Sequence, residues 1–302
     1  MRNFTTLFDS NYLIYGLNMY ESLLRYYNED FILYCLALDD ITINKLKDLP
    51  NIKIYTINDL VYAPYFNDLI ENNPSKPNDL SPYHWALASM FTNYIMNTQD
   101  VDDLLYVDAD IMFFNEINYI FQSLDNKSIG LITHKHTEFG SYVGFFNVGI
   151  IYFRNDIIGK KALDWWTKTV ATKDPTYKQY ATCGDQKYLE LFGTLFDYNA
   201  INVFDEDIGH ASPLNITRGK LTFSNEKIHF YWDGEIVFQQ KVTLEQLLIF
   251  FHFSHFTPDY KNNKYKVDRS GEWGNLLDHE NTKYIYDLYF EECKRIKDKY
   301  NI

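Results

Sequence analysis

Residues 104–114 read LLYVDADIMFF, and this stretch decides the fold more than any other part of the chain. Its apolar residues predict a buried strand that ends on Asp108 and Asp110. Strand side chains alternate between two faces, so these carboxylates are expected to point the same way. Two like charges beside apolar flanks are costly to desolvate, and a divalent cation bound to phosphate oxygens would relieve that cost. The alternative is an acidic turn at a strand end, where Asp is common.

The composition indicates one large α/β domain with ample material for a core, because the chain has 302 residues and 46% of them are hydrophobic. A formal charge of −13 argues against a nucleic-acid partner, which would need a basic surface. It leaves room for a single nucleotide, since a bound metal supplies local positive charge. The three cysteines contain no CxxC pair, which indicates a reducing compartment without disulfides or a zinc site.

The N-terminal half alternates strand and helix patterns. No GxGxxG follows the first strand, so a dinucleotide-binding fold of the Rossmann type is not supported. This rhythm predicts a parallel sheet with helices on both faces. The predicted order is strand 3–8, helix 12–27, strand 31–38, helix 41–49 and strand 52–57.

The rest of the chain continues the α/β pattern and then becomes less regular. Residues 61–82, rich in Pro, Asn and Asp, are expected to be irregular, and 194–256 to mix short strands with turns. The remaining predictions are helix 83–97, strands 129–134 and 147–153, helices 157–170 and 184–191, and an amphipathic helix 281–300. No repeat, no secretory signal and no bilayer-spanning apolar run is found, so a cytoplasmic protein is expected.

Polar residues follow the first strand at Asp9, Asn11 and Tyr12. Ligands of open α/β sheets bind at the carboxyl ends of the strands, so Asp9 could accept a hydrogen bond from a base on which Tyr12 stacks. The alternative is a helix N-cap followed by an aromatic residue on the helix face, and the residues taken alone favour it.

Two later segments offer groups that suit a sugar. Asn147 stands at the mouth of a strand, where its amide can donate to and accept from hydroxyls; a turn Asn is the equal alternative. Asp185 and Gln186 stand at a helix start. The acid there can be explained by the helix dipole, but the glutamine has no such structural reason, which favours a functional role.

His252 and His255 lie among aromatic residues late in the chain, without an HExxH motif. One imidazole together with two Asp carboxylates is a suitable ligand set for Mn²⁺. The alternative for each is a hydrogen-bonded core histidine.

Taken in order, these segments resemble the nucleotide-diphospho-sugar transferases with a GT-A fold, most closely glycosyltransferase family 8 of the bacterial surface-polysaccharide type. Residues 6–12 (TLFDSNY) look like the family's first nucleotide-binding strand and turn, and Asp108-Ala109-Asp110 like its DxD motif. Residues 146–149 (FNVG) resemble its FNxG strand, Asp185-Gln186 its DQ pair, and His252 its late metal-binding histidine. The colinearity of these signals over residues 4–256 carries the resemblance.

The resemblance implies a single α/β domain of GT-A fold over residues 1–260, with a mostly parallel central sheet, and a helical C-terminal extension over 261–302 packed on it. It implies a metal-dependent transfer of a sugar from a nucleotide sugar, by default a UDP-sugar, to a glycan, a lipid-linked glycan or another hydroxyl acceptor, with retention of configuration. Mn²⁺ or Mg²⁺ is the implied cofactor. Membrane contact would be peripheral at most, at the inner face.

The resemblance also assigns roles to residues. Asp9, Asn11 and Tyr12 would hold the nucleotide base. Asp108 would contact ribose and metal, and Asp110 and His252 the metal. Asn147 would bind the donor sugar, with Asp185 and Gln186 beside the anomeric carbon. Acceptor contacts are expected within 61–91 and 205–235 from the position of these segments alone, and not from the resemblance.

The late motif departs from the family pattern, which continues after the histidine with a glycine and a lysine that binds the diphosphate. Both are missing from their places here. Lys261 is the expected substitute, with Lys264 and His255 as alternatives.

Two other functions stay open at this point. A haloacid-dehalogenase-like phosphohydrolase also places a DxD after an apolar strand, but normally on its first strand. A carbohydrate-binding protein on a transferase scaffold without activity would explain the missing lysine, although the intact Asp108 and Asp110 pair argues against it.

Overall fold

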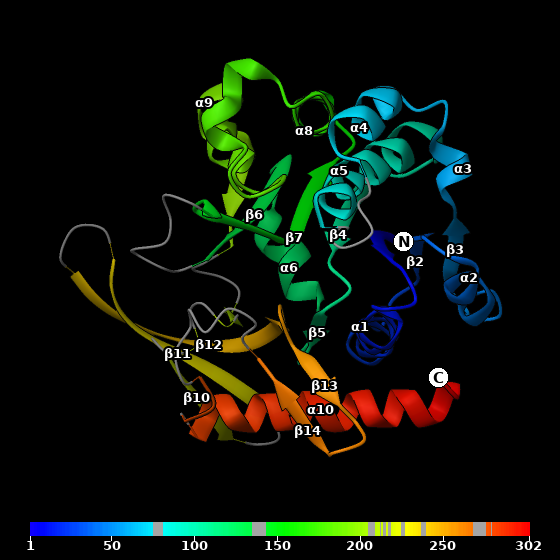
Figure 1. Ribbon diagram of the computed structural model, residues 1–302. Coiled ribbons are helices and arrows are strands. Elements are labelled where there is room, and N and C mark those ends of the chain that lie inside the picture. The colour runs from blue at the N-terminus through cyan, green and yellow to red at the C-terminus, as the bar shows by residue number, and fades with distance from the viewer. Residues whose placement is uncertain are drawn as a thin grey trace. The chain divides into compact units, whose positions relative to one another are not determined.

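The computed structural model describes residues 1–74, 81–134, 143–204, 209–211, 213, 216, 219–224, 227–236, 240–267, 276–278 and 280–302. The chain forms two compact units, each made of several segments (Figure 1). Unit 1 comprises residues 1–13, 29–108 and 124–203, and unit 2 comprises residues 14–28, 109–123 and 204–302.

Unit 1 is built on a seven-stranded sheet in which β7 alone runs against its neighbours. All other described strands of the sheet are parallel, so they present their carboxyl ends at one edge. The strand order is β3 (Ile52–Tyr55), β2 (Phe31–Ala37), β1 (Arg2–Phe8), β4 (Asp103–Val107), β7 (Phe146–Arg154), β6 (Ile129–Thr133) and β8 (Ile201–Val203).

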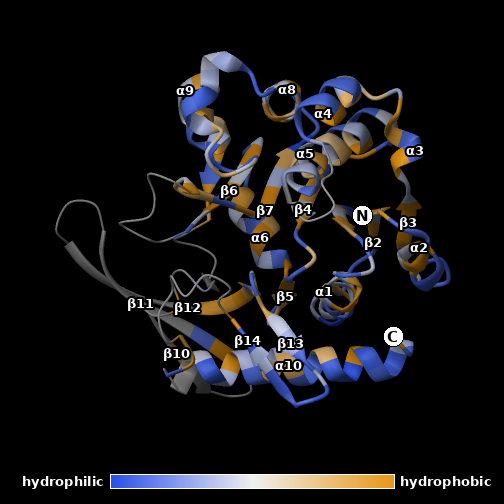
Figure 2. Cartoon of the chain, in the orientation of Figure 1, coloured by the Kyte–Doolittle hydropathy of each residue, from blue (hydrophilic) through white to orange (hydrophobic). Residues whose placement is uncertain are grey.

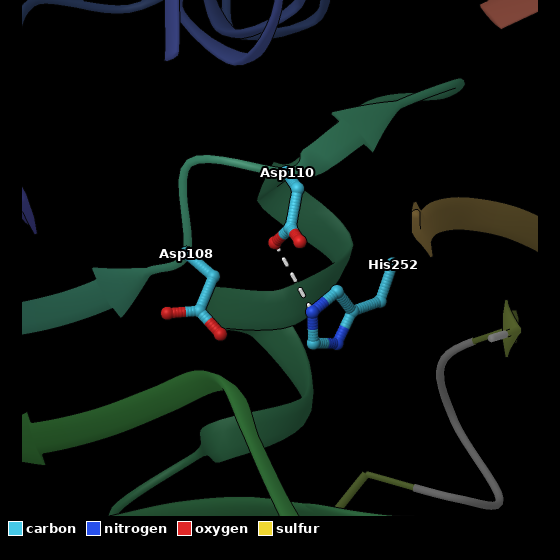
Figure 3. Close-up of side chains that lie close together, drawn as sticks. All are labelled: Asp108, Asp110 and His252. Atoms are coloured by element: carbon cyan, nitrogen blue, oxygen red, sulfur yellow. Dashed lines mark ion pairs between the residues drawn. The ribbon is translucent and has the colours of Figure 1, made fainter. Parts of the chain in front are cut away.

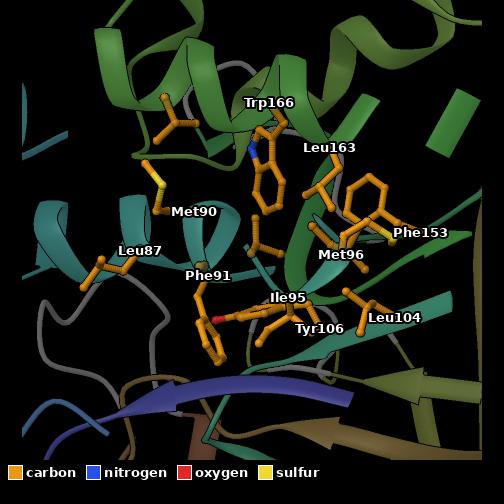
Figure 4. Close-up of a cluster of buried hydrophobic side chains, with 14 of the residues drawn as sticks. Leu87, Met90, Phe91, Ile95, Met96, Leu104, Tyr106, Phe153, Leu163 and Trp166 are labelled. Atoms are coloured by element: carbon orange, nitrogen blue, oxygen red, sulfur yellow. The ribbon is translucent and has the colours of Figure 1, made fainter. Parts of the chain in front are cut away.

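One face of this sheet packs against α5 (Ser81–Thr98) and α8 (Ile157–Thr172), as Figure 4 shows. Alternation along β4 directs Leu104 and Tyr106 into this core, where they meet side chains of both helices. Trp166 is fully buried and stacks on Phe153, with ring centroids 6.1 Å apart. In Figure 2 β7 is largely in the hydrophobic colour, as expected for a strand buried on both faces.

Shorter elements complete unit 1. They are α2 (Asp40–Leu46), α3 (Ile57–Leu60), α4 (Phe66–Asn72), α9 (Phe192–Leu195) and the 3₁₀ turns η1 (Pro175–Tyr180), η2 (Lys187–Leu191) and η3 (Tyr198–Ala200). The Asp156 side chain caps α8 by accepting from the backbone N–H groups of Ile158 and Gly159.

Unit 2 has its own sheet, in the order β10 (Gly219–Ser224), β11 (Lys227–Ile236), β12 (Gln240–His252), β5 (Ile111–Phe113), with β9 (Gly209–Ala211) parallel to β12. Most of α1 (Leu13–Tyr26) and α6 (Asn118–Leu124) belong to this unit. So do the hairpin β13 (Thr257–Asp259) and β14 (Lys264–Lys266), the turn η5 (Leu276–Asp278) and α10 (Glu280–Tyr300).

Aromatic side chains form the core of unit 2. The rings of Phe253 and Tyr289 stack with centroids 3.7 Å apart, and Phe256 and Tyr286 pack around them. Tyr289 and Tyr286 come from one face of α10, which alternates hydrophobic and hydrophilic colours in Figure 2. The predicted amphipathic helix at the end of the chain is thus confirmed.

The predicted α/β class and mostly parallel sheet are confirmed, and most predicted elements in residues 1–60 and 83–170 agree with the structure within a few residues. The strand predicted to end on Asp108 and Asp110 agrees with β4, but the passage of residues 111–113 into a second sheet was not predicted. Strand β4 ends at Val107 and β5 begins at Ile111 in the other sheet, because the residues between them bond to different partners. The Asp108 N–H donates to the Gly149 carbonyl, whereas the Asp110 carbonyl accepts from Phe253 N–H.

Three further expectations need correction. Residues 61–82 are not irregular throughout, because they contain α4; residues 75–80 lie outside the described part. The helix expected over 184–191 is the short 3₁₀ turn η2. The short strands expected over 194–256 include two long ones, β11 with 10 residues and β12 with 13. The division into a domain 1–260 and an extension 261–302 stays a prediction.

No helix in the described ranges is both long and apolar enough to cross a membrane.

The core of unit 1 is expected to depend on the inner face of α8. Leu163 is fully buried there, so Leu163→Ala should lower the free energy of unfolding by about 2–5 kcal/mol. Lys168 lies on the exposed side of the same helix, and Lys168→Ala should change that free energy by less than about 0.5 kcal/mol. Urea denaturation followed by circular dichroism measures both, and equal effects would contradict the packing described.

Candidate active site

Polar residues gather where three adjacent strands meet one edge of the unit 1 sheet. Asp9 directly follows β1 and Asp108 directly follows β4, which lies beside β1 with Thr5 paired to Tyr106. Because β7 runs the other way, its first residues reach the same edge, where Asn147 is its second residue. This edge is where open α/β sheets bind their ligands.

Asp108, Asp110 and His252 offer three ligand atoms that all lie within 4.8 Å of one another (Figure 3). His252 Nε2 is 3.1 Å from Asp110 Oδ1. The pair is set by strand register, because His252 is the last residue of β12 and pairs with Ile111, the neighbour of Asp110. The turn after β4 then adds Asp108.

The electrostatics of the cluster favour a cation. Burial acts to raise the pKa of Asp110, but the charge and hydrogen bond of His252 outweigh burial and hold this pKa below its usual value. The Asp108 carboxylate accepts a hydrogen bond of 2.5 Å from the Tyr106 hydroxyl. Two carboxylate oxygens and one imidazole nitrogen fit Mn²⁺ well and Mg²⁺ less well, since Mg²⁺ prefers oxygen ligands.

Asp9, Asn11 and Tyr12 form one tight turn at the end of β1. Asp9 Oδ1 accepts from the backbone N–H groups of Asn11 at 3.0 Å and Tyr12 at 3.2 Å, and Oδ2 accepts from Asn11 Nδ2 at 3.0 Å. These bonds give Asp9 a local structural role in the turn before α1, which begins at Leu13. A role in holding a base stays a prediction.

Asp185 is a buried carboxyl group without a matching cation among the described residues. Its side chain is about 4% exposed, and its Oδ2 has no hydrogen-bond partner. Burial, and secondly the nearby charge of Asp108, raise the pKa of Asp185 well above its usual value. A buried oxygen without a partner is costly, and a ligand hydroxyl could relieve that cost by donating to it.

The turn that presents Asp185 is fixed by tryptophans. Trp166 Nε1 donates to the Asp185 carbonyl at 2.9 Å. Gly184 has φ of +56°, and a Cβ added there would lie 2.3 Å from Cε3 of Trp85. Only glycine combines this backbone conformation with such close contact.

Gln186 has a structural role that the sequence did not predict. Its Nε2 donates to the Val143 carbonyl at 2.7 Å, and its Oε1 accepts from Val148 N–H at 3.3 Å. The argument that this glutamine has no structural reason is therefore wrong. Its assignment as a catalytic residue stays a prediction.

Asn147 is tied to a residue that the sequence analysis missed. Its Nδ2 is 3.0 Å from Nε2 of His134, which is buried and directly follows β6. The sequence could have identified His134, because a histidine at the end of a predicted parallel strand lies at the same sheet edge as Asp108.

Lys261 is the expected substitute for the diphosphate lysine. Lys261 is exposed in the turn between β13 and β14, and within the described ranges no hydrogen bond or ion pair joins it to the three ligand residues. The acceptor region expected over 205–235 falls largely outside the residues whose side chains are described. Its role, like that of Lys261, stays a prediction.

Comparison with known proteins gives the fold a name. No protein-family model matches the chain. Its sequence is 24% identical over 314 residues to the uncharacterized protein YfnF of Bacillus subtilis (strain 168), covering 97% of this chain and 92% of YfnF. The structure is similar to an active-site glutamine-to-glutamate mutant of LgtC, with a TM-score of 0.56, 12% identity and coverage of 96% of this chain and 95% of that one.

A second LgtC structure, the galactosyltransferase in complex with donor and acceptor sugar analogs, has a TM-score of 0.52 and 16% identity, covering 71% of this chain and 77% of that one. The chain has the GT-A fold. The fold predicted from the resemblance is thereby confirmed. At these identities the similarity concerns the fold.

The Gly184 turn should be intolerant of a side chain. We expect Gly184→Ala to destabilise the protein by about 1–3 kcal/mol, from the left-handed backbone and the clash with Trp85. Gly193 is the matched control, because it lies in α9 and a Cβ there would meet its nearest neighbour at 3.8 Å. Gly193→Ala should be neutral or stabilise by up to about 1 kcal/mol. Urea denaturation compares the two, and equal tolerance would contradict the geometry.

Proposed function

We propose that the protein is a metal-dependent glycosyltransferase that moves a sugar from a nucleotide sugar, with UDP as the default nucleotide, to a hydroxyl acceptor. The observation that carries the proposal is the cluster of Asp108, Asp110 and His252 at the ligand-binding edge of a GT-A sheet. Carboxylates beside a phosphate would repel it unless a cation lies between them.

The roles follow from where the side chains lie. Asp108, Asp110 and His252 would hold Mn²⁺ or Mg²⁺, and the bound ion would stabilise the negative charge of the departing diphosphate. The turn of Asp9, Asn11 and Tyr12 would hold the base, and Lys261 is the proposed diphosphate contact.

The sugar would lie beside Asn147 and Asp185. The unpartnered Oδ2 of Asp185 supports this, because a sugar hydroxyl would supply the missing donor. Gln186 would lie next to the anomeric carbon because it follows Asp185 in the sequence. Its amide is hydrogen-bonded to the backbone of Val143 and Val148. The chemistry asks these residues to position the donor and to exclude water, so that the acceptor hydroxyl reacts instead.

The acceptor is proposed to be a glycan or a lipid-linked glycan used in surface-polysaccharide or glycoconjugate synthesis, at the inner face of the membrane. The donor and acceptor sugar analogs named for the LgtC complex support a two-sugar reaction. Membrane contact would be peripheral at most. Basic residues at the end of α10 are engaged in ion pairs, with Lys299 Nζ 2.6 Å from Glu21 and Arg295 Nη2 2.8 Å from Glu292.

The phosphohydrolase alternative has less support, because the DxD turn follows the fourth strand of the chain rather than the first. The sugar-binding alternative is separated by turnover: a binding protein would retain a nucleotide sugar without hydrolysing or transferring it. Release of inorganic phosphate from a simple monoester would instead favour the phosphohydrolase.

Metal-dependent nucleotide binding is the first expected outcome. In the presence of Mn²⁺, one of the four nucleotides UDP, GDP, CDP and dTDP should raise the melting temperature of the wild type. A ligand at about a hundred times its dissociation constant stabilises the folded protein by about 2.7 kcal/mol. The shift should vanish without Mn²⁺. Asp110→Ala should abolish it, and Asp110→Asn, which keeps the shape but removes the charge, should weaken it strongly.

Asp298→Ala is the control, because Asp298 is exposed on α10 and should leave the shift unchanged. A nucleotide shift that survives both Asp110 variants would contradict the assignment of the metal ligands. The absence of any shift in the wild type would contradict the proposed function.

The reaction is expected to retain the anomeric configuration of the donor sugar. Proton NMR of the first product formed with a simple sugar acceptor would show the same anomeric coupling pattern as the donor. A product of inverted configuration would contradict the proposed class of transferase while leaving nucleotide-sugar transfer itself intact.

A further inference from the structure

The segment Val143–Val148 leads into β7, and side chains hold much of its backbone. Gln186 bonds to the Val143 carbonyl and to Val148 N–H. Glu190 Oε1 accepts from Phe145 N–H at 2.8 Å. This use of several polar side chains on one short segment indicates that its position is closely specified.

His134 contacts this segment through both of its ring nitrogens. The side chain is buried, with 3% exposed, and its Nδ1 is 3.0 Å from the Gly144 carbonyl while its Nε2 is 3.0 Å from Asn147 Nδ2. A carbonyl only accepts, so Nδ1 must carry a proton. An amide nitrogen only donates, so Nε2 must be unprotonated. The two contacts together require the neutral Nδ1–H tautomer.

The Asn147 amide has one orientation that satisfies its neighbours. Its Oδ1 accepts from Gly149 N–H at 2.7 Å while its Nδ2 donates to His134. A flipped amide would oppose donor to donor at Gly149 and acceptor to acceptor at Nε2 of His134. The carbonyl of Gly149 in turn accepts from Asp108 N–H at 2.9 Å, so Gly149 links the amide to the DxD turn.

We propose that His134 is a positioning residue for the sugar-binding end of the site: through the Nδ1–H tautomer it fixes the Asn147 amide in the orientation that receives the donor sugar. This inference rests on the proposed function and adds a residue to it. His134 acts through Asn147 and not through the nucleotide or the metal. Loss of His134 therefore affects the sugar part of the donor and spares the nucleotide part.

Isothermal titration calorimetry with Mn²⁺ separates these two parts. The probes are UDP, UDP-glucose and UDP-galactose, and the quantity is the ratio of the dissociation constant of the sugar conjugate to that of UDP. For the sugar that the wild type binds better, His134→Ala should raise this ratio about tenfold, as for the loss of one hydrogen bond, and leave the dissociation constant of UDP within about twofold.

A double-mutant cycle tests whether His134 acts through Asn147. In the Asn147→Ala background, His134→Ala should change the ratio by less than about twofold, because the amide it orients is gone. Additive effects, or equal weakening of UDP and conjugate, would overturn the proposal in favour of a purely structural role. Lys168→Ala, at an exposed position of α8, is the control that should change neither constant.

The wild-type chain provides an independent readout. Nitrogen-15 NMR of the histidine rings should show His134 protonated at Nδ1 and unprotonated at Nε2, and the opposite tautomer or a doubly protonated ring would overturn the proposal. This measurement also decides the case in which His134→Ala does not fold. If none of the four nucleoside diphosphates stabilises the wild type with Mn²⁺, the proposed function fails and this inference with it; a ratio unchanged in His134→Ala overturns the inference alone.

Discussion

The turn from Asp108 to Asp110 is the constraint on which the rest of the site depends. Asp108 N–H bonds to Gly149 in one sheet, and the Asp110 carbonyl bonds to Phe253 beside the end of another. Backbone hydrogen bonds fixed at both ends leave the turn little freedom. The carboxylates are therefore held near each other by the backbone against their mutual repulsion. This arrangement is favourable only if a positive charge compensates it, and a divalent cation held by the two carboxylates and His252 would supply that charge.

Backbone hydrogen bonds of the same kind also position the other polar groups of the site in unit 1. Gly149 accepts from Asp108 and donates to the Asn147 side chain, so one glycine sets two site residues. Val148, next to it, donates to Gln186, whose neighbour Asp185 is held by Trp166. A chain of direct hydrogen bonds thus links residues from distant parts of the sequence. A displacement at any of them would be transmitted to the others, since the buried groups have few alternative partners.

Much of the fold could be predicted from sequence because it rests on periodicity. The alternating strands and helices of the first 60 residues, and the amphipathic α10, follow from side-chain spacing alone. The passage of residues 111–113 into a second sheet could not be predicted, because an apolar run looks the same whichever sheet it joins. Helix α4 was missed because it is short, rich in Asn and begins after Tyr65, whose φ of 65° no composition rule predicts.

Candidate site residues could be named from sequence where ligand chemistry dictates residue type, and not where one side chain supports another. Asp108, Asp110 and His252 were named because carboxylates and imidazole bind metal ions, and the structure brings their ligand atoms within 4.8 Å of one another. His134 was missed although its place at the end of a predicted strand was visible in the sequence. Its contacts with Gly144 and Asn147, like those of Gln186 with Val143 and Val148, join residues that only the folded chain brings into reach.

Features that oppose stability gather on the turn beside the proposed sugar position. Gly184 adopts a left-handed conformation, and Asp185 buries a carboxyl oxygen without a partner and near a like charge. An apolar residue in place of Asp185 would remove the desolvation cost, which is several kcal/mol for an ionised group and about 1–3 kcal/mol for an unsatisfied polar one. A chain that keeps this arrangement at the ligand edge of its sheet gives up stability there. A polyhydroxyl ligand, which can supply the missing donor, accounts for that loss better than any role in the core.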